Sequence, residues 1–125
     1  MKTKFFVIFV VGVILFVGAL GFFMNRNTTK SVNLDAFAQC LKASGAEFYG
    51  AFWCPHCQDQ KKEFGSSAKY LPYIECSNAD QTQTQICKDK KIESYPTWIF
   101  KDGTIQTGKL ELAQLAAKTG CVLPQ

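Results

Sequence analysis

The chain has 125 residues, of which 14 are Lys or Arg and 10 are Asp or Glu, and it contains six cysteines. This length suits one small domain, and the mild positive charge, without a basic run interleaved with aromatic residues, argues against a nucleic-acid partner. Cytosolic proteins are kept reduced and rarely carry so many cysteines, so the count favours an oxidising compartment.

The N-terminal segment is long and apolar. Lys2 and Lys4 precede a run over residues 5–24 that has no charged residue. About 20 helical residues span a hydrocarbon core of about 30 Å, so we expect an uncleaved single-pass membrane anchor with its N-terminus inside. A cleaved signal sequence is the alternative, because small residues such as Ala19 and Gly21 lie at tolerable positions for cleavage. Either interpretation places the remaining chain outside the cytoplasm, tethered to the membrane or released as a secreted or periplasmic protein.

The next residues predict a tether and the start of a folded domain. Residues 25–32 are polar, and we expect them to link residues 1–24 to a domain over residues 33–125. Asn33 is a suitable N-cap for a first helix, and Gly45 supplies its end. The helical spacing is carried by apolar residues: Leu34, Phe37 and Leu41.

Apolar runs and turn signals predict the remaining elements. A helical connection between the first two strands makes them parallel, and an Asp-Gly turn at residues 102–103 adds an antiparallel edge. The prediction is an α/β fold with a compact four-stranded mixed sheet flanked by helices. We expect strands at residues 46–52, 73–76, 97–100 and 104–108, and helices at residues 55–70 (with a weak point at Gly65), 81–92 and 110–119.

The segment Trp53-Cys54-Pro55-His56-Cys57 carries the chemistry. A structural zinc site needs four ligands, and no second Cys-x-x-Cys pair is present, so a metal site is disfavoured. Gln58 after Cys57 excludes the haem-attachment pattern. A purely structural bond is also disfavoured, because closing so short a loop removes little entropy from the unfolded chain. The third hypothesis, a redox-active pair, remains.

A redox role has a physical mechanism. Cys54 is expected at the N-terminus of a helix, where unpaired N–H groups and the helix dipole favour the nucleophilic thiolate. Cys57 would lie in the first turn, more buried, and would attack a mixed disulfide formed at Cys54. His56 adds partial positive charge or is an ordinary surface residue. The mechanism requires that Cys54 be accessible to another chain.

These motifs resemble the thioredoxin superfamily. GAFWCPHC at residues 50–57 is followed by SYPTW at residues 94–98 and an Asp-Gly hairpin, and the resemblance covers residues 33–121. The longer stretch AEFYGAFWCPHCQDQKKEFG, with LPYIEC, is similar to the small thioredoxin-like domain found alone or fused to bacterial homologues of vitamin K epoxide reductase.

The resemblance implies a substrate-binding surface. It implies that the Tyr95-Pro96 bond is cis and packs against the disulfide, whereas an ordinary trans turn is the alternative from base rates. The backbone of Tyr95 would pair with an extended substrate peptide, and Trp53 and Pro55 would lie at the rim. The dipeptide Pro55-His56 matches that of strongly oxidising DsbA-type enzymes.

One residue departs from the thioredoxin pattern. Phe48 occupies the place of a buried acid six residues before the first cysteine. Glu47 is adjacent but should point to the opposite face of the strand. The route by which Cys57 gains or loses its proton is therefore left open.

The other four cysteines are candidates for structural disulfides. The resemblance favours a bond between Cys76 and Cys87, which would contribute about 2–4 kcal/mol. Cys40 and Cys121 then pair by elimination, although thioredoxin topology puts their helices on opposite faces of the sheet. The alternatives are a core residue for Cys40 and a free or intermolecular thiol for Cys121.

The sequence thus predicts an extracytoplasmic thiol–disulfide oxidoreductase that oxidises the thiols of substrate proteins and needs no prosthetic group or metal. The resemblance implies re-oxidation by a membrane quinone-linked partner, similar to vitamin K epoxide reductase or DsbB. One alternative is a reductase or isomerase, for example of apocytochrome thiols. Another is a thioredoxin-like module that binds peptides without turnover.

Overall fold

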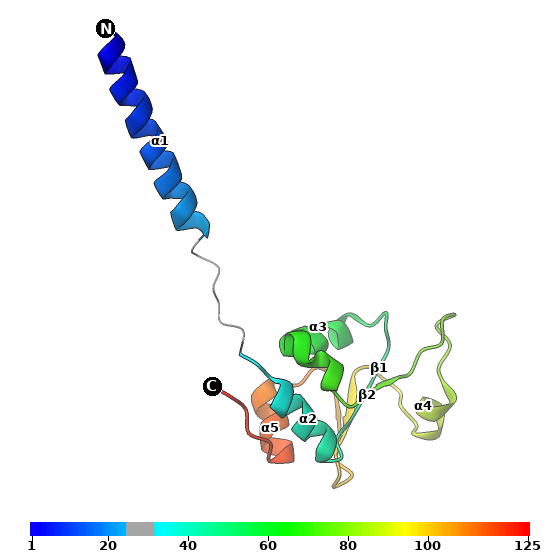
Figure 1. Cartoon of the computed structure of the whole chain (residues 1–125). Coiled ribbons are helices and arrows are strands. Elements are labelled where there is room, and N and C mark those ends of the chain that lie inside the picture. The colour runs from blue at the N-terminus through cyan, green and yellow to red at the C-terminus, as the bar shows by residue number, and fades with distance from the viewer. Residues whose placement is uncertain (25–31) are drawn as a thin grey trace. The chain divides into compact units, whose positions relative to one another are not determined.

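A computed structural model describes residues 1–24 and 32–125, which belong to two units, residues 1–31 and 32–125 (Figure 1). The described part of the first unit is a helix, α1 (Lys2–Met24). Its span Lys2–Phe22 is long and apolar enough to cross a membrane, a criterion that an N-terminal signal sequence also meets. The expected tether lies outside the described residues, apart from Val32.

The second unit is built on a four-stranded sheet with the spatial order β2-β1-β3-β4. Strand β1 runs parallel to β2 and antiparallel to β3, and β4 pairs antiparallel with β3. The predicted mixed sheet, with a parallel pair and a hairpin edge, is therefore confirmed. The strands are β1 (Glu47–Gly50), β2 (Tyr73–Glu75), β3 (Thr97–Ile99) and β4 (Ile105–Thr107).

Local sequence signals set the helix boundaries. The side-chain oxygen of Asn33 accepts the N–H of Asp35 at 2.8 Å, so Asn33 supplies the cap from one position before the structural N-cap. Gly65, with φ of 53°, ends α3, and the chain continues as a 3-10 helix instead of the single helix expected to Tyr70. The helices are α2 (Asp35–Ala43), α3 (Pro55–Phe64), η2 (Gly65–Tyr70), α4 (Gln85–Asp89) and α5 (Leu112–Thr119).

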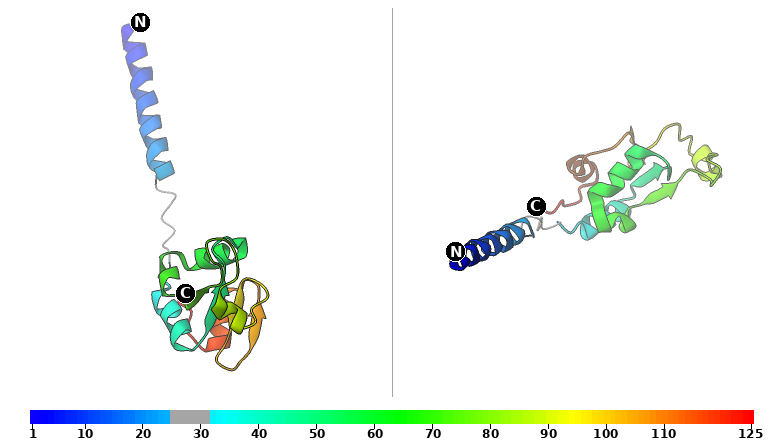
Figure 2. Two further views of the ribbon diagram at one scale, coloured as in Figure 1. Left: turned by 90° about the vertical axis from the view of Figure 1, so that its right-hand side faces the viewer. Right: turned by 90° about the horizontal axis from the view of Figure 1, so that it is seen from above.

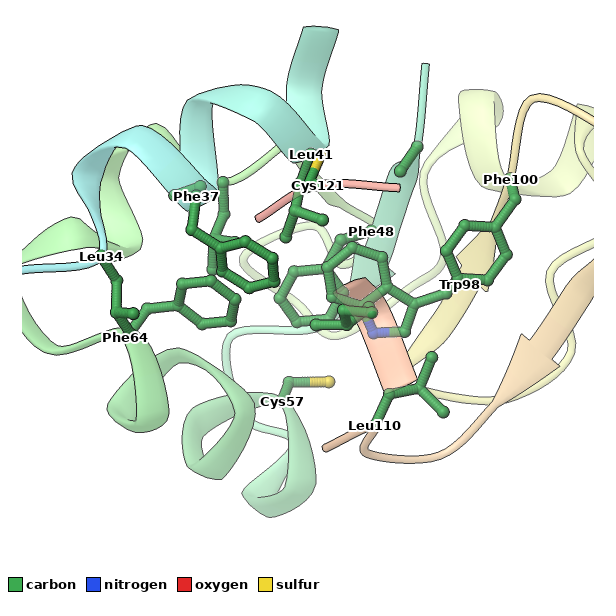
Figure 3. Close-up of a cluster of buried hydrophobic side chains, with 14 of the residues drawn as sticks. Leu34, Phe37, Leu41, Phe48, Cys57, Phe64, Trp98, Phe100, Leu110 and Cys121 are labelled. Carbon is green, nitrogen blue, oxygen red and sulfur yellow. The ribbon is translucent and has the colours of Figure 1, made fainter. Parts of the chain in front are cut away.

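The main hydrophobic core covers one face of the sheet (Figure 3). Phe48 of β1 lies opposite Trp98 of β3, and their rings stack with centroids 4.6 Å apart. Phe37 of α2 stacks on Phe64 of α3 at 5.9 Å, and Leu115 of α5 belongs to the same cluster. Burial of these large apolar side chains supplies the main driving force for folding.

A second cluster covers the opposite face. Tyr49 of β1 points there and is fully buried, and its hydroxyl donates to the Glu47 carboxylate at 2.7 Å. Cys76 and Cys87 lie in this cluster and form a disulfide with an S–S distance of 2.03 Å. Short α4 lies on this side of the sheet, away from α2 and α5 (Figures 1 and 2).

The expected placement of the first and last helices of the domain is wrong. Buried residues of α2 and α5 belong to the same cluster as Phe48, so both helices pack on one face of the sheet. This arrangement brings Cys40 of α2 beside Cys121, just beyond α5. The two form a disulfide with an S–S distance of 2.08 Å, and the chain does not have to cross an edge of the sheet to reach it.

The helix predicted over residues 81–92 is also shorter than expected. Residues 77–84 are held instead by backbone hydrogen bonds, from Asn78 N–H to the carbonyl of Thr82 and from Thr84 N–H to the carbonyl of Cys76, each at 2.8 Å. A bridge between Ser77 and Gln83 closes this loop. Because the loop bonds to the chain around Cys76, the helix begins only at Gln85.

Candidate active site

Cys54 and Cys57 lie where β1 gives way to α3. Cys54 is the N-cap of α3, and its Sγ accepts the N–H of Cys57 at 3.3 Å. The Cys57 thiol donates to the same sulfur, with 2.7 Å between the two Sγ atoms, and neither residue is disulfide-bonded. Two donors and the positive end of a helix dipole therefore converge on the Cys54 sulfur, an arrangement that stabilises negative charge.

The two sulfurs are both enclosed. Cys54 is 4% exposed and Cys57 is 1% exposed, so Cys54 presents less surface than an accessible nucleophile was expected to present. The Cys57 side chain points into the core below Phe48 and Trp98 (Figure 3). Burial, and then the hydrogen bond to Cys54, raise the pKa of the Cys57 thiol to about 12, although the Lys61 ammonium works in the opposite direction.

Aromatic side chains line the mouth of the site. Trp53 is 44% exposed, and its indole N–H donates to the Ser77 hydroxyl at 2.8 Å. The Trp53 ring meets the Tyr95 ring edge-on at 5.9 Å. Phe52 is also exposed. The predicted rim residue Trp53 and the Tyr95-Pro96 segment are thus brought together, although Trp53 and Tyr95 are 42 positions apart in the chain.

The Tyr95-Pro96 peptide bond is cis, as the resemblance implied. Pro96 is fully buried, and its carbonyl accepts the N–H of Gly108 at 2.8 Å. The Tyr95 hydroxyl accepts a bond from the Gln83 amide at 3.1 Å. No hydrogen bond to the backbone N–H or carbonyl of Tyr95 occurs within residues 32–125. Those backbone groups are therefore open to pair with another extended chain.

Pro55 and His56 occupy the first turn of α3 and are exposed. Pro55 is the first residue of the helix, where a missing N–H costs nothing. The charge-modulating role of His56 stays a prediction. Among the described residues, no group of three or more His, Cys, Asp or Glu side chains gathers in an arrangement that could hold a metal ion.

Sequence reasoning missed Gly50, which makes room for the site. A Cβ added to Gly50 would lie 2.8 Å from Cε2 of Tyr73 and 2.9 Å from Sγ of Cys57. Both distances are shorter than van der Waals contact, so only glycine lets the Cys57 sulfur and the Tyr73 ring approach β1 this closely. The signal was the position of Gly50 inside a buried strand, which often marks a close approach.

Glu75 was also missed. One carboxylate oxygen accepts the backbone N–H groups of Phe52 at 3.1 Å and Ser77 at 3.0 Å, and the other accepts the Tyr73 hydroxyl at 2.8 Å. Tyr73 and Glu75 are two residues apart in β2, so their side chains lie on the same face of the sheet. This relation could have been inferred from the segment YIEC once it was predicted to be a strand. Glu75 therefore anchors the loop that leads into Trp53 and Cys54.

The place of the expected buried acid is apolar. Phe48 is fully buried, and Glu47 points to the other face, where it binds Tyr49 and Lys90. Gln60 is a fully buried polar side chain at this core, and it bonds both the N–H and the carbonyl of Leu110 at 2.8 and 3.0 Å. Since an amide does not titrate, Gln60 cannot take the part of the missing carboxylate.

Comparisons with known proteins agree with this geometry. The family model described as thioredoxin matches residues 28–119, which is more than half of the chain. The chain is also similar to "Thiol-disulfide oxidoreductase LTO1" of Arabidopsis thaliana, with 46% identity over 95 residues. That alignment covers 72% of this chain but only 25% of the plant protein, so the chain spans a quarter of the length of this relative.

Proposed function

Because the chain belongs to the thioredoxin family, we propose that it is a thiol–disulfide oxidoreductase that works through Cys54 and Cys57. The observation that carries this proposal is the Cys54 sulfur at the N-terminus of α3, where it accepts bonds from both the backbone and the thiol of Cys57. The name of the Arabidopsis relative supports the same activity.

The proposed reaction is an exchange of disulfide bonds. A substrate thiolate attacks Sγ of Cys54 in the Cys54–Cys57 disulfide, a substrate–Cys54 bond forms, and Cys57 leaves with the electron pair. A second substrate thiolate then attacks the substrate sulfur and releases Cys54. The substrate gains a disulfide, the protein gains two thiols, and the protons lost by the substrate balance those taken up by the protein.

We assign substrate binding to the aromatic mouth and the neighbouring backbone. The unpaired backbone groups of Tyr95 offer one donor and one acceptor to an extended peptide, in the manner of strand addition. Trp53 and Pro55 are exposed beside them and would contact the peptide side chains. The small exposed surface of Cys54 implies that a substrate must dock closely before exchange occurs.

We propose that the chain acts as an oxidant. The support is the Pro55-His56 dipeptide and the absence of a carboxylate at Phe48, which a reductant would use to deprotonate Cys57. A reduction potential near about −120 mV fits the oxidant, whereas a value near about −270 mV would favour the alternative, a reductase or isomerase. An equilibrium with glutathione buffers, followed by tryptophan fluorescence or alkylation, measures that potential.

We propose that α1 holds the protein at the membrane, with the thioredoxin domain outside the cytoplasm, and that a membrane quinone-linked partner re-oxidises it. The support is the length and apolar composition of α1 and the presence of two disulfides in the domain. The partner would resemble bacterial vitamin K epoxide reductase or DsbB. Membrane fractionation, with protease added to sealed cells or spheroplasts, tests both the anchor and the side on which the domain lies.

Substitution of single cysteines tests the reaction itself. When Cys57→Ser is offered an oxidised substrate, the Cys54 thiolate should attack the substrate disulfide and the mixed disulfide should accumulate, because no Cys57 sulfur is present to displace the substrate. Cys54→Ser should abolish exchange and trap nothing. If the Cys54→Ser protein supports cellular function as well as the unmodified chain, the proposal fails and a peptide-binding module without turnover is the better interpretation.

A further inference from the structure

We propose that Lys61 is a positioning residue that stabilises the thiolate of Cys57, and that Tyr73 and Glu75 hold its ammonium group in place. This inference rests on the proposed function, since it concerns the sulfur that disulfide exchange releases. The sequence has Phe48 at the position of the expected buried acid, and the charged group that acts on Cys57 is instead the Lys61 ammonium.

The position of Lys61 follows from the helix. Lys61 comes four residues after Cys57 in α3, so the two side chains lie on one helix face. Its Nζ atom lies 3.3 Å from the centroid of the Tyr73 ring. Within the described residues Lys61 has no carboxylate partner within 4.0 Å, while the next residue, Lys62, pairs with Asp59 at 3.5 Å. The Lys61 ammonium is therefore not neutralised by a carboxylate, and it can interact with the Tyr73 ring and the Cys57 sulfur.

Tyr73 connects the ammonium group to the sulfur. Its Cε2 atom and the Cys57 sulfur approach the same point above Gly50, at 2.8 and 2.9 Å. Its hydroxyl is fixed by the Glu75 carboxylate at 2.8 Å. A cation on the face of an aromatic ring is stabilised by the ring quadrupole, more so when partly removed from water. Lys61 is half-buried here, so this contact restrains a side chain that would otherwise be mobile.

Disulfide exchange through Cys57 requires a group that stabilises negative charge on its sulfur. Whether exchange runs toward oxidation or reduction, one step places negative charge on Cys57, either as leaving group or as attacking thiolate. Burial raises the pKa of that thiol to about 12, and the Lys61 charge lowers it. Within residues 32–125, the titratable side chains that face Cys57 are Cys54 from the preceding loop, Lys61 from its own helix and Tyr73 from β2. Of these, Lys61 is the cation.

The test uses Cys57 alone, in the full chain carrying Cys54→Ser. Because the pKa of Cys57 is about 12, the rate of alkylation by iodoacetamide is measured in brief pH jumps from about pH 8 to about pH 13, which yields a plateau rate and a midpoint. Lys61→Met should move the midpoint upward and slow alkylation about 3- to 10-fold at a fixed pH below it. Lys61→Arg keeps the charge and should stay within about twofold of the parent. Lys62→Met, the matched control, should change neither quantity.

The outcomes separate this inference from simple changes in structure. A lower plateau with an unmoved midpoint in Lys61→Met would mean altered access only, and it would overturn the proposal. An equal shift in Lys62→Met would overturn it as well, because any nearby lysine would then suffice. Tyr73→Phe keeps the ring but loses the bond to Glu75, and an unmoved midpoint there would remove the Glu75 carboxylate and the Tyr73 hydroxyl from the proposal.

The outcome of this experiment does not depend on whether the proposed function is correct. Alkylation needs no substrate protein and no redox partner. If the unmodified chain fails to exchange disulfides while Lys61→Met still shifts the Cys57 midpoint, the proposed function falls and the role of Lys61 survives.

Discussion

Cys54 and Cys57 differ in their surroundings although they share one turn of α3. The Cys54 sulfur receives the hydrogen bonds, and the Cys57 sulfur donates one and is packed in the core. This asymmetry supports the proposal that substrate attacks Cys54, and burial raises the pKa of the Cys57 thiol. The difference arises because Cys54 is the N-cap residue that precedes α3, whereas Cys57 lies in the first turn of the helix on its buried face.

The first prediction at the residue scale concerns pH. The pKa of Cys57 rises from 9.0 to about 12 on folding, so the folded state holds this proton more tightly than the unfolded state. The resulting stability is present below about pH 9 and is lost as the pH rises toward 12. The free energy of unfolding of Cys54→Ser, measured in urea, should therefore fall over this pH range relative to that of Cys54→Ser/Cys57→Ser. The pKa of Tyr49 and of Tyr73 is raised first by burial and then by a bond to a glutamate, and these larger causes are common to both proteins and cancel.

A second prediction at this scale concerns Gly50. Gly50→Ala should lower the free energy of unfolding by roughly 1–3 kcal/mol, because the added methyl group overlaps the Tyr73 ring and the Cys57 sulfur. Chemical denaturation measures the loss. In a Cys57→Ala background the same change should cost less, since the sulfur is gone. An equal cost in both backgrounds would show that the sulfur is not what Gly50 accommodates.

At the scale of elements, the buried amide of Gln60 joins α3 to the connection between β4 and α5, and a more exposed ion pair between Lys109 and Glu63 joins the same two segments. Gln60 accepts the Leu110 N–H, donates to the Leu110 carbonyl and accepts the Trp98 indole N–H at 3.3 Å. These bonds are buried, so each group would be left without a partner if the amide were lost. Gln60 thus fixes the end of the sheet against the helix that carries the cysteines.

We predict that Gln60→Leu destabilises the domain by about 3 kcal/mol, because a side chain of similar size leaves three buried polar groups unpaired. Gln58→Leu is the matched control on the exposed side of the same helix. It loses only a solvent-exposed bond from the Gln58 amide to the Phe52 carbonyl and should change stability by less than about 1 kcal/mol. Denaturant midpoints of the two variants, measured with the disulfides intact, decide between them. Similar losses in both would contradict the role given to Gln60.

Most of the helices and strands could be predicted from the sequence. Apolar runs, Pro55, Gly65 and the Asp-Gly turn are local signals, and the strands and most helix ends follow them. The packing side of α2 and α5 could not be obtained this way, because periodicity gives the apolar face of a helix but not the layer it joins. Gln60 escaped notice for a similar reason, since glutamine in a helix usually faces solvent.

For the whole molecule, two disulfides close segments of very different length. Cys40 and Cys121 are 81 positions apart, whereas Cys76 and Cys87 are 11 apart. Chain entropy predicts that the long closure stabilises the fold by about 4.5 kcal/mol and the short one by about 3 kcal/mol. The long closure also joins the first helix of the domain to its C-terminal end, so it acts on the whole unit.

We predict that Cys40→Ala/Cys121→Ala lowers stability more than Cys76→Ala/Cys87→Ala does, by about 1–2 kcal/mol at most, in denaturant unfolding. Cys76 and Cys87 are fully buried, so their removal also leaves a cavity that narrows the difference. A larger loss from the short pair would show that packing around Cys76 outweighs the entropy of closure. Cys54 and Cys57 stay in place in both proteins.

The Cys40–Cys121 bond has a mechanical consequence for a chain pulled from its N-terminal end. Tension applied between the two ends of the chain passes from Cys40 straight across the sulfur–sulfur linkage to Cys121. The intervening polypeptide, with every strand and the redox pair, is bypassed and cannot be drawn out. Stretching in a force spectrometer should extend only the segments before Cys40 and after Cys121, and the full contour length should appear once a reductant is added.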